Sequence, residues 1–374
     1  MTDISPLQSE LKKLIKSSGP MPVWRYMEMC LMHPQYGYYV SRDPLGREGD
    51  FTTAPEVSQM FGELIGLWAA SVWKAIGSPS VFRLIELGPG RGTMMSDALR
   101  ALRVLPPMYQ ALSIHLVEIN PVLREKQKAT LSGVRNVAWH HGIDEVPAGP
   151  SVILANEYFD VLPVHQVVKR PTGWHERTVE LDADGKLMFG AAPEPTPRFE
   201  VLLPPLVRAG PVGAVFEWRP DAEIMKLAAR VRDQNGAALI IDYGHLRSDA
   251  GDTFQAIARH SFTDPLKNPG QADVTAHVDF QALVRAAEDI GACVHGPVPQ
   301  GDFLKRLGIE TRAIGLMAKA TPEISEDIAG ALKRLIGGGR GGMGSMFKVL
   351  AISEPHLTSL AGFSDEEPAE KTET

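Results

Sequence analysis

The chain has 374 residues, of which 44% are hydrophobic and 22% charged, so it is long enough for one large globular domain with insertions or for two domains. The formal net charge of -7 argues against a nucleic-acid partner, because affinity for a phosphate backbone comes from clustered Lys and Arg side chains. The two cysteines, Cys30 and Cys293, are too few for a disulfide framework or a thiolate-rich zinc site, and we predict no metal site.

Helical patterns dominate the N-terminal part of the chain. Apolar spacing predicts three helices, at 5–17, 20–32 and 55–76, with a loop over 33–55. Thr53 and Glu56 have the spacing of a capping box at the start of the third helix. Alternatively, the loop that contains Asp50 and Thr53 covers a bound cofactor. We therefore expect residues 1–78 to form a helical cap with a cofactor-covering loop.

From residue 81 onward, short apolar strands alternate with helices. Strands are predicted at 81–87, 113–118, 136–140, 151–156 and 237–242, and helices at 94–103, 121–131 and 221–233. Apolar strands separated by helices form a parallel sheet that is covered on both faces. The predicted fold class is therefore α/β, with a doubly wound, Rossmann-like sheet.

Insertions and a C-terminal part complete this second domain, which we expect to span residues 79–355. The insertions are predicted at about 164–205, as antiparallel hairpins, at 243–275, as irregular polar chain, and at 300–340. Later elements are a helix at 279–290, a strand near 292–295, helices within 302–336 and a strand at 346–352. The acidic tail at 356–374 is expected to be disordered.

The segment 337–344 consists mostly of glycine. We interpret it as a flexible connector into the last strand. The alternatives are a mobile lid or a self-modified Arg-Gly-Gly site.

A glycine-rich loop directly follows the first predicted strand, in the run Glu86-Leu87-Gly88-Pro89-Gly90-Arg91-Gly92. Small residues let the backbone approach a ligand, and the start of the next helix presents unpaired N–H groups. Such a loop binds either a dinucleotide or S-adenosylmethionine. The dinucleotide pattern GxGxxG requires Gly or Ala at the position of Thr93, so the spacing favours S-adenosylmethionine. Glu86 would order the loop or receive the amino group of the cofactor.

The next two strands also end in polar residues. Glu118, followed by Ile119, ends the second strand, where a carboxylate can accept hydrogen bonds from both ribose hydroxyls. Ile143 and Asp144 follow the third strand, where an apolar face and a carboxylate suit an adenine ring. The candidate cofactor-binding residues are Asp50, Thr53, Glu86, Gly88, Pro89, Gly90, Gly92, Glu118, Ile119, Ile143, Asp144 and Asn156.

The fourth strand runs into Asn156, Glu157 and Asp160, and the fifth ends at Asp242. Ligands of a doubly wound sheet bind beyond the carboxyl ends of its strands, so Glu157, Asp160 and Asp242 are the candidate catalytic residues. Two carboxylates could bind the planar fork of a guanidinium and orient one nitrogen toward the methyl group. The alternative is that Glu157 and Asp160 cap the turn that follows the strand.

Several stretches together resemble the MidA-like methyltransferases, a family that includes the mitochondrial protein arginine methyltransferase needed for complex I assembly. The matching stretches are 33–39, 49–56 with 61–63, 86–92, 156–166, 241–244 and 270–280. The resemblance implies a class I methyltransferase fold and cofactor binding at Gly88, Gly90 and Glu118. For the mitochondrial branch it also implies symmetric dimethylation of an arginine in a complex I subunit.

The leading functional hypothesis is a protein arginine N-methyltransferase whose cofactor is S-adenosyl-L-methionine and whose partner is a protein substrate, such as a respiratory complex I subunit. The alternatives are a small-molecule methyltransferase and an assembly factor that binds the cofactor with little turnover. An NAD-dependent oxidoreductase is disfavoured by the glycine spacing. Since the sequence contains no run of about 18 apolar residues and no signal-peptide pattern, we expect no membrane span and a cytoplasmic location.

Overall fold

The computed structural model describes residues 5–41, 53–258, 261–339 and 341–363. Its largest sheet has the strand order β15-β16-β10-β5-β2-β3-β4, and β14 pairs with the end of β10. The strands are β2 (Phe82–Leu87), β3 (Leu112–Val117), β4 (Val137–His140), β5 (Ser151–Asn156), β10 (Gly236–His245), β14 (Val278–Asp279), β15 (Cys293–Pro299) and β16 (Phe347–Ser353). The strands from β10 to β4 are parallel, and β15 and β16 are antiparallel to their neighbours.

The order of the parallel strands reverses direction beside β2. The chain goes from β2 outward to β3 and β4, and then returns to place β5 on the other side of β2. Crevices for ligands form at such a switch point, outside the carboxyl ends of the strands. This arrangement confirms the prediction of a doubly wound α/β sheet.

Helices bury both faces of this sheet, and successive residues of a strand point to opposite faces. On one face, Leu154 and Leu239 pack with α5, α6, α13 and α14. On the other face, Ile153 and Ile240 pack with α11 and α12. The helices of this part of the chain are α4 (Ala54–Val57), α5 (Gln59–Ala75), α6 (Thr93–Leu102), α7 (Pro106–Ala111), α8 (Pro121–Thr130), α11 (Ala222–Gln234), α12 (Phe280–Asp289), α13 (Gln300–Arg306), α14 (Ile309–Met317) and α15 (Pro322–Ile336), with a short 3-10 turn at Ile143–Glu145.

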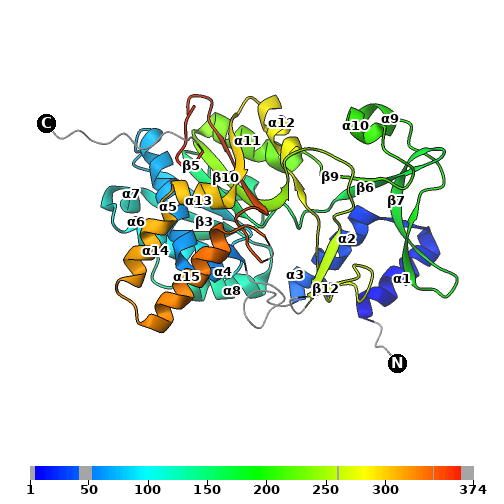
Figure 1. The fold of residues 1–374 in the computed structure, drawn as a ribbon, viewed down its shortest axis with the longest axis horizontal. Helices are drawn as coiled ribbons and strands as arrows, with labels where there is room; N and C mark the ends of the chain where they lie inside the picture. Colours follow the sequence, from blue (N-terminus) through cyan, green and yellow to red (C-terminus); the bar gives the residue numbers. More distant parts are fainter. Residues whose placement is uncertain (1–4, 42–52, 259–260, 340, 364–374) are drawn as a thin grey trace.

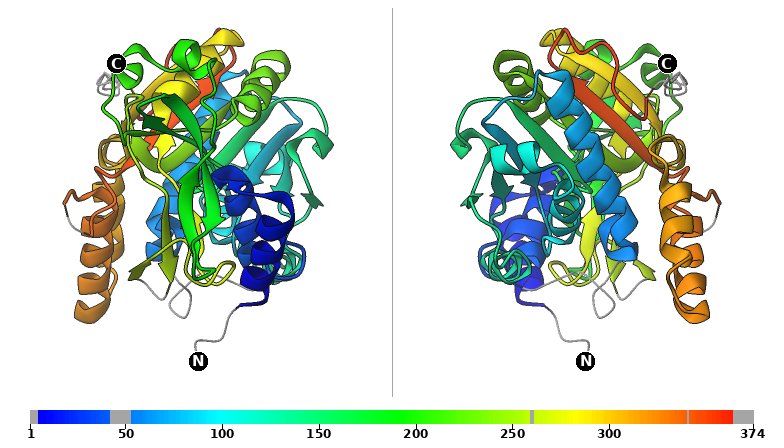
Figure 2. Two further views of the ribbon diagram at one scale, coloured as in Figure 1. Left: turned by 90° about the vertical axis from the view of Figure 1, so that its right-hand side faces the viewer. Right: turned by 90° about the vertical axis from the view of Figure 1, so that its left-hand side faces the viewer.

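A second sheet lies at the opposite end of the molecule from α6, α7 and α14 (Figure 1). Its order is β1-β7-β6-β9, with β8 paired to β7. Its strands are β1 (Met21–Pro22), β6 (His165–Arg170), β7 (Gly173–Leu181), β8 (Leu187–Ala191) and β9 (Val215–Trp218), and the short helices α9 (Phe199–Leu202) and α10 (Pro205–Arg208) lie between β8 and β9. Figure 2 shows α1 (Pro6–Ser18) and α2 (Val23–Met32) side by side with β7, and the three elements share one hydrophobic cluster.

A third sheet, of order β12-β11-β13, forms in a region that we expected to be irregular. Its strands are β11 (Gln255–Ala258), β12 (Ser261–Thr263) and β13 (Asp273–Thr275). The prediction was wrong here because the strands are only three or four residues long, too short to show alternation. Ala256 and Val274 bury this sheet against the cluster that contains α1 and α2.

Three other boundaries differ from the predicted ones. The helix expected at 55–76 is broken into α4 and α5, because the Ser58 side chain caps a new helix by accepting from Met60 N at 3.2 Å. Helix α5, which we grouped with the cap, packs against the main sheet instead. The tail expected to be disordered from residue 356 is ordered to residue 363, since Leu357 and Leu360 are buried in the core. Residues 364–374 lie outside the described residues.

Among the helices that the structure describes, none has both the length and the apolar character needed to cross a bilayer.

Candidate active site

One cavity of about 790 Å³ lies at the switch point between β2 and β5. Residues at the ends of four parallel strands line it. The N-terminal region, the third sheet and the segment that follows α15 contribute the other lining residues. The lining residues used below are Tyr39, Thr53, Glu56, Glu86, Gly88, Pro89, Gly90, Glu118, Ile119, Asn156, Glu157, Asp160, Tyr243, Ile257, Phe262, Asp273, His277, Arg334 and Met343. The cavity is therefore where both the cofactor and the acceptor were predicted to lie.

The glycine loop forms one wall of the cavity. Gly88, Gly90 and Gly92 all have positive φ angles, of 58°, 54° and 80°, which is a conformation that favours glycine. A Cβ at Gly88 would lie 3.2 Å from the ring of Tyr158, so the backbone is closely packed there as well. The loop is held by hydrogen bonds from Gly88 N to Val117 O, at 3.0 Å, and from Gly92 N to Pro89 O, at 2.7 Å.

Glu118 lies beside this loop with its carboxylate held in place. Its Oε1 accepts from Asn120 N at 2.8 Å, and its Oε2 accepts from the side chain of Gln127 at 3.2 Å. The same Gln127 amide donates to Gly90 O at 2.7 Å, and so joins the ends of β2 and β3. Gln127 was not predicted as a site residue, because a polar residue in the middle of a helix carries no sign of such a contact.

Glu86 is buried beneath the glycine loop with 3% of its surface exposed. Its Oε2 has no hydrogen-bond partner among the described residues. Burial raises the pKa of Glu86 to about 8, because a carboxylate is poorly solvated there. A buried carboxyl without a partner beside a cavity fits a ligand that brings a positively charged group.

Glu157, directly after β5, adopts a φ of 50°, which is uncommon for a residue with a side chain. Its Oε1 accepts from Ala54 N at 3.4 Å and from the Asn156 amide at 3.3 Å. Burial, and to a lesser extent the charge of Asp160, raise its pKa to about 8. Its carboxylate contacts the first residue of α4 and lines the cavity, and it does not cap its own following turn.

Asp160 is held rigidly at the cavity wall by its main chain. Its N–H donates to Asp242 Oδ2 at 3.2 Å, and its carbonyl accepts from Arg219 at 2.9 Å. Arg219 also donates to the carbonyls of Leu162, at 3.0 Å, and of Ala276 and His277, both at 2.8 Å. It thereby joins the chain after β5 to the turn after β13.

Four predicted site residues lie away from the cavity. Asp242 does not line it: this fully buried carboxylate accepts from the amides of Phe159 and Asp160, so it positions the loop after β5. Gly92 caps α6 behind the loop. Ile143 is buried in the hydrophobic core, and Asp144 is exposed and forms an ion pair with Lys226 at 3.3 Å, so neither residue predicted for the adenine ring lines the cavity. Asp50 lies outside the described residues.

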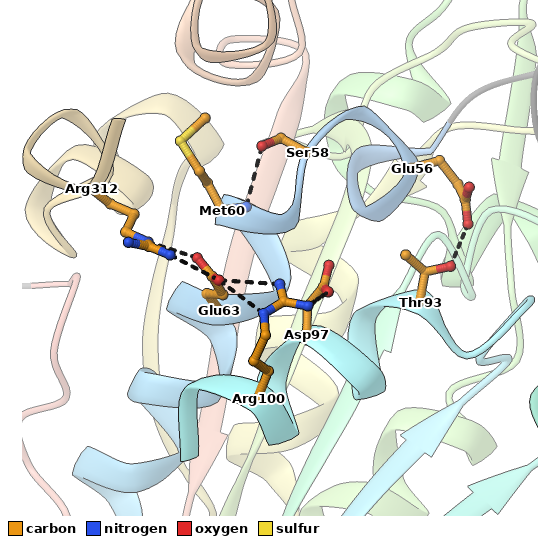
Figure 3. A network of polar contacts seen from close by, with 8 residues as sticks. All are labelled: Glu56, Ser58, Met60, Glu63, Thr93, Asp97, Arg100 and Arg312. Atoms are coloured by element: carbon orange, nitrogen blue, oxygen red, sulfur yellow. Dashed lines mark hydrogen bonds and ion pairs between the residues drawn. The ribbon is translucent and has the colours of Figure 1, made fainter. Parts of the chain in front are cut away.

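Thr53 and Glu56 line the cavity, but they do not form the predicted capping box. Thr53 precedes α4 without a side-chain cap bond, and Glu56 Oε1 accepts from Thr93 Oγ1 at 2.6 Å. Figure 3 shows this contact beside a second one, in which buried Glu63 of α5 lies between Arg100 and Arg312. Arg312 Nε is 2.8 Å from Glu63 Oε2, and Arg100 Nη2 is 3.1 Å from Oε1. The first contact joins α4 to α6, and the second joins α5 to α6 and α14.

Several lining residues were not predicted as site residues, among them Tyr39, Tyr243, Asp273 and His277. Each of them lies within a stretch that matches the family. The family resemblance therefore pointed to these residues. Arg334 at the end of α15 also lines the cavity, and within the glycine-rich segment 337–344 the lining residues are Gly339, Gly341, Gly342 and Met343. Within the described ranges, no three His, Cys, Asp or Glu side chains are grouped so that they could hold a metal ion.

Comparison with known proteins agrees with the resemblance predicted from the motifs. Residues 64–298 match the model of a family described as "Putative S-adenosyl-L-methionine-dependent methyltransferase". The human protein named "Protein arginine methyltransferase NDUFAF7, mitochondrial" is 37% identical, over 97% of this chain and 90% of its own length. The corresponding Drosophila melanogaster homologue is 38% identical over 92% of this chain and 84% of its own length.

A solved structure also resembles this chain closely. It is a protein from Burkholderia thailandensis bound to S-adenosyl-homocysteine, with 30% sequence identity and a TM-score of 0.82. The match covers 97% of this chain and 95% of that protein. The likeness extends over the whole fold, including the second sheet, and confirms the predicted class of fold.

Proposed function

This chain belongs to a family of S-adenosyl-L-methionine-dependent methyltransferases, and from that premise we propose that it transfers the methyl group to an arginine side chain of a protein. The observation that carries the proposal is the position of Glu157 and Asp160. Both carboxylates line the cavity that the glycine loop also lines, and Asp160 Oδ1 is buried with no hydrogen-bond partner among the described residues. Buried carboxylates attract a cation, and arginine presents the planar cation that two carboxylates bind best.

The residues around the glycine loop fit the cofactor. Glu118 would bind the ribose hydroxyls, the loop at Gly88 and Gly90 would pack against the nucleoside, and Glu86 would bind the amino group. When bound there, the cofactor supplies an electrophilic methyl group on a sulfonium. Asn156, whose Oδ1 has no partner among the described residues, lines the same cavity at the end of β5.

The acceptor end of the cavity is assigned to Glu157 and Asp160. They would bind the guanidinium and hold one nitrogen toward the methyl group that the cofactor supplies. The methylated nitrogen then loses its proton, and Glu157, whose raised pKa suits a base near neutral pH, receives it.

Cofactor binding is expected to depend on pH through Glu86. Its raised pKa means that the carboxyl is mostly protonated below about pH 8 in the ligand-free protein. A cationic amino group favours the ionised form, so binding releases a proton and tightens with rising pH, by at most about tenfold per pH unit. Titration calorimetry with S-adenosylhomocysteine in phosphate and in Tris should give different apparent enthalpies at one pH. Glu86→Gln should reduce that difference, and equal enthalpies for the wild type would contradict the assignment.

We also propose that the acceptor is a subunit of a respiratory complex I and that the chain works in the cytoplasm. The acceptor proposal rests on the family resemblance and on the relatives' names. The cytoplasmic proposal is supported by Cys30 and Cys293, which are both free thiols, as in reducing compartments. Fluorescence microscopy of a tagged chain tests the location.

The acceptor is tested by incubating the purified protein with cofactor carrying a deuterated methyl group and with purified complex I subunits. Mass spectrometry should find the label on an arginine side chain. Label on a small molecule would favour the alternative of a small-molecule methyltransferase. Stable binding to a subunit without any label would favour the assembly factor with little turnover.

A further inference from the structure

The acceptor end of the cavity contains an acidic residue that neither the cofactor nor the methyl transfer has used so far. Asp273 lies in β13, where it pairs with Ile257 of β11, and 5% of its surface is exposed. It lines the cavity together with Asp160 and Tyr39. The three residues come from β13, from the chain after β5 and from α3 (Tyr38–Ser41), so only the folded chain brings them together.

Tyr39 connects the two acids. Its hydroxyl interacts with the carboxylate of Asp273, and the charge of Asp160 also acts on it. Burial, followed by the charges of Asp273 and Asp160, raises the pKa of Tyr39, so its hydroxyl stays protonated and acts as a donor. The ring is fixed by an edge-on contact with Tyr38, at a centroid distance of 5.2 Å. Tyr39 therefore orients the Asp273 carboxylate.

The carboxylate of Asp160 is placed to accept a hydrogen bond from a ligand at the acceptor end of the cavity. With 4% of its surface exposed, its Oδ1 has no hydrogen-bond partner among the described residues. The Tyr243 hydroxyl interacts with the same carboxylate. Because Asp242 and Arg219 hold the main chain of this residue on both sides, it cannot easily turn away to find another partner.

The charge of the cavity favours a cation as the occupant. Among the described residues, the lining contains six carboxyl groups, those of Glu56, Glu86, Glu118, Glu157, Asp160 and Asp273, and a bound cation stabilises the ionised form of each. The cationic side chains of the described lining are Arg91 and Arg334. Glu86 and Glu118 lie at the end of the cavity that is assigned to the cofactor. Asp160 and Asp273 have no assigned contact with the cofactor. Ile257 and Phe262, paired across β11 and β12, add an apolar surface on the same side.

We propose that Asp160, Asp273 and Tyr39 form the subsite that selects the guanidinium of the acceptor arginine, with Asp273 as a further substrate-contacting residue. The two carboxylates approach from different segments and so can bind different N–H edges of the planar cation. Glu157 then faces the nitrogen that receives the methyl group. Ile257 and Phe262 pack against the methylene stem of the same side chain. This inference rests on the proposed function.

The test compares two acceptor analogues that differ only in charge. Nα-acetyl-arginine methylamide and its citrulline counterpart have the same shape, but the urea group of citrulline is neutral. Each is titrated by NMR into the full-length protein saturated with S-adenosylhomocysteine. We expect the arginine compound to bind at least about tenfold more tightly, because charged hydrogen bonds to two buried carboxylates are lost with citrulline.

Substitutions of the subsite residues test whether the subsite causes the preference for arginine over citrulline. Asp273→Asn should lower the arginine affinity about tenfold or more and leave S-adenosylhomocysteine affinity within about twofold. Asp289→Asn, an exposed acid on α12, serves as the matched control and should bind like the wild type. Tyr39→Phe keeps the ring and removes the hydroxyl, so it should show a smaller loss of several-fold, and it decides the question if Asp273→Asn does not fold.

The outcomes separate the subsite from the function on which it rests. Equal binding of the arginine and citrulline compounds, or wild-type arginine affinity in both Asp273→Asn and Tyr39→Phe, would overturn the subsite while S-adenosylhomocysteine still binds. If the folded wild-type protein does not bind S-adenosylhomocysteine, the proposed function itself is contradicted.

Discussion

Glu157→Gln is expected to slow methyl transfer by at least about 100-fold while leaving S-adenosylhomocysteine affinity within about twofold. The substitution keeps the size of the side chain, and its amide oxygen can still accept from Ala54 N and from the Asn156 amide. It removes the negative charge that binds the guanidinium and the base that takes its proton. The rate is measured by transfer of a tritiated methyl group to the acceptor protein, and the affinity by titration calorimetry.

The control for this variant is Glu326→Gln, which changes an exposed acid of α15 and should transfer at the wild-type rate. Circular dichroism establishes whether each variant is folded. A folded Glu157→Gln protein with the wild-type rate would remove Glu157 from the chemistry. An unfolded one would mean that its contact with α4 is its main role.

Arg219→Gln is expected to lower the free energy of unfolding by about 3 kcal/mol, because four carbonyl groups each lose the hydrogen bond from this guanidinium, and Asp160 O keeps the bond from Ala276 N. Those carbonyls belong to two separate turns, and a glutamine amide has two N–H groups on a shorter stem. Arg219→Lys should not restore stability, since an ammonium group cannot match the fork geometry. Urea unfolding followed by circular dichroism measures the change.

Arg285→Gln provides the matched control for Arg219. Arg285 makes an exposed contact with Asp221 at 3.3 Å, and exposed ion pairs contribute about 1 kcal/mol at most. If Arg219→Gln were no less stable than Arg285→Gln, the junction between the second sheet and the cavity would not depend on this side chain.

The central sheet could be predicted well from the sequence. The strand predicted at 151–156 coincides with β5, and the one predicted at 237–242 lies within β10. Both strands are buried on two faces, so their sequences are nearly continuous apolar runs that need no knowledge of distant residues. The glycine loop was recognisable for a similar reason, because its positive φ angles are a local requirement that selects glycine.

The acceptor end could not be predicted in the same way, since it depends on contacts between distant parts of the chain. Asp273 reaches the cavity because β13 pairs with β11, and Arg219 reaches the loop after β5 from the end of β9. Asp144, which was predicted to lie beside an adenine ring from its position along the chain, does not line the cavity and pairs with Lys226. The positions of the strands were predictable, whereas the direction of a loop side chain was not.

The most direct test of the account is titration calorimetry of the wild type and Gly90→Val with S-adenosylhomocysteine. Gly90 lines the cavity at a φ of 54°, so valine there both strains the backbone and fills space next to the ligand. We predict binding in the micromolar range for the wild type and a loss of at least about 100-fold in the variant. Unchanged affinity in a folded Gly90→Val protein, or no binding to the folded wild type, would contradict the claim that this cavity is the cofactor site.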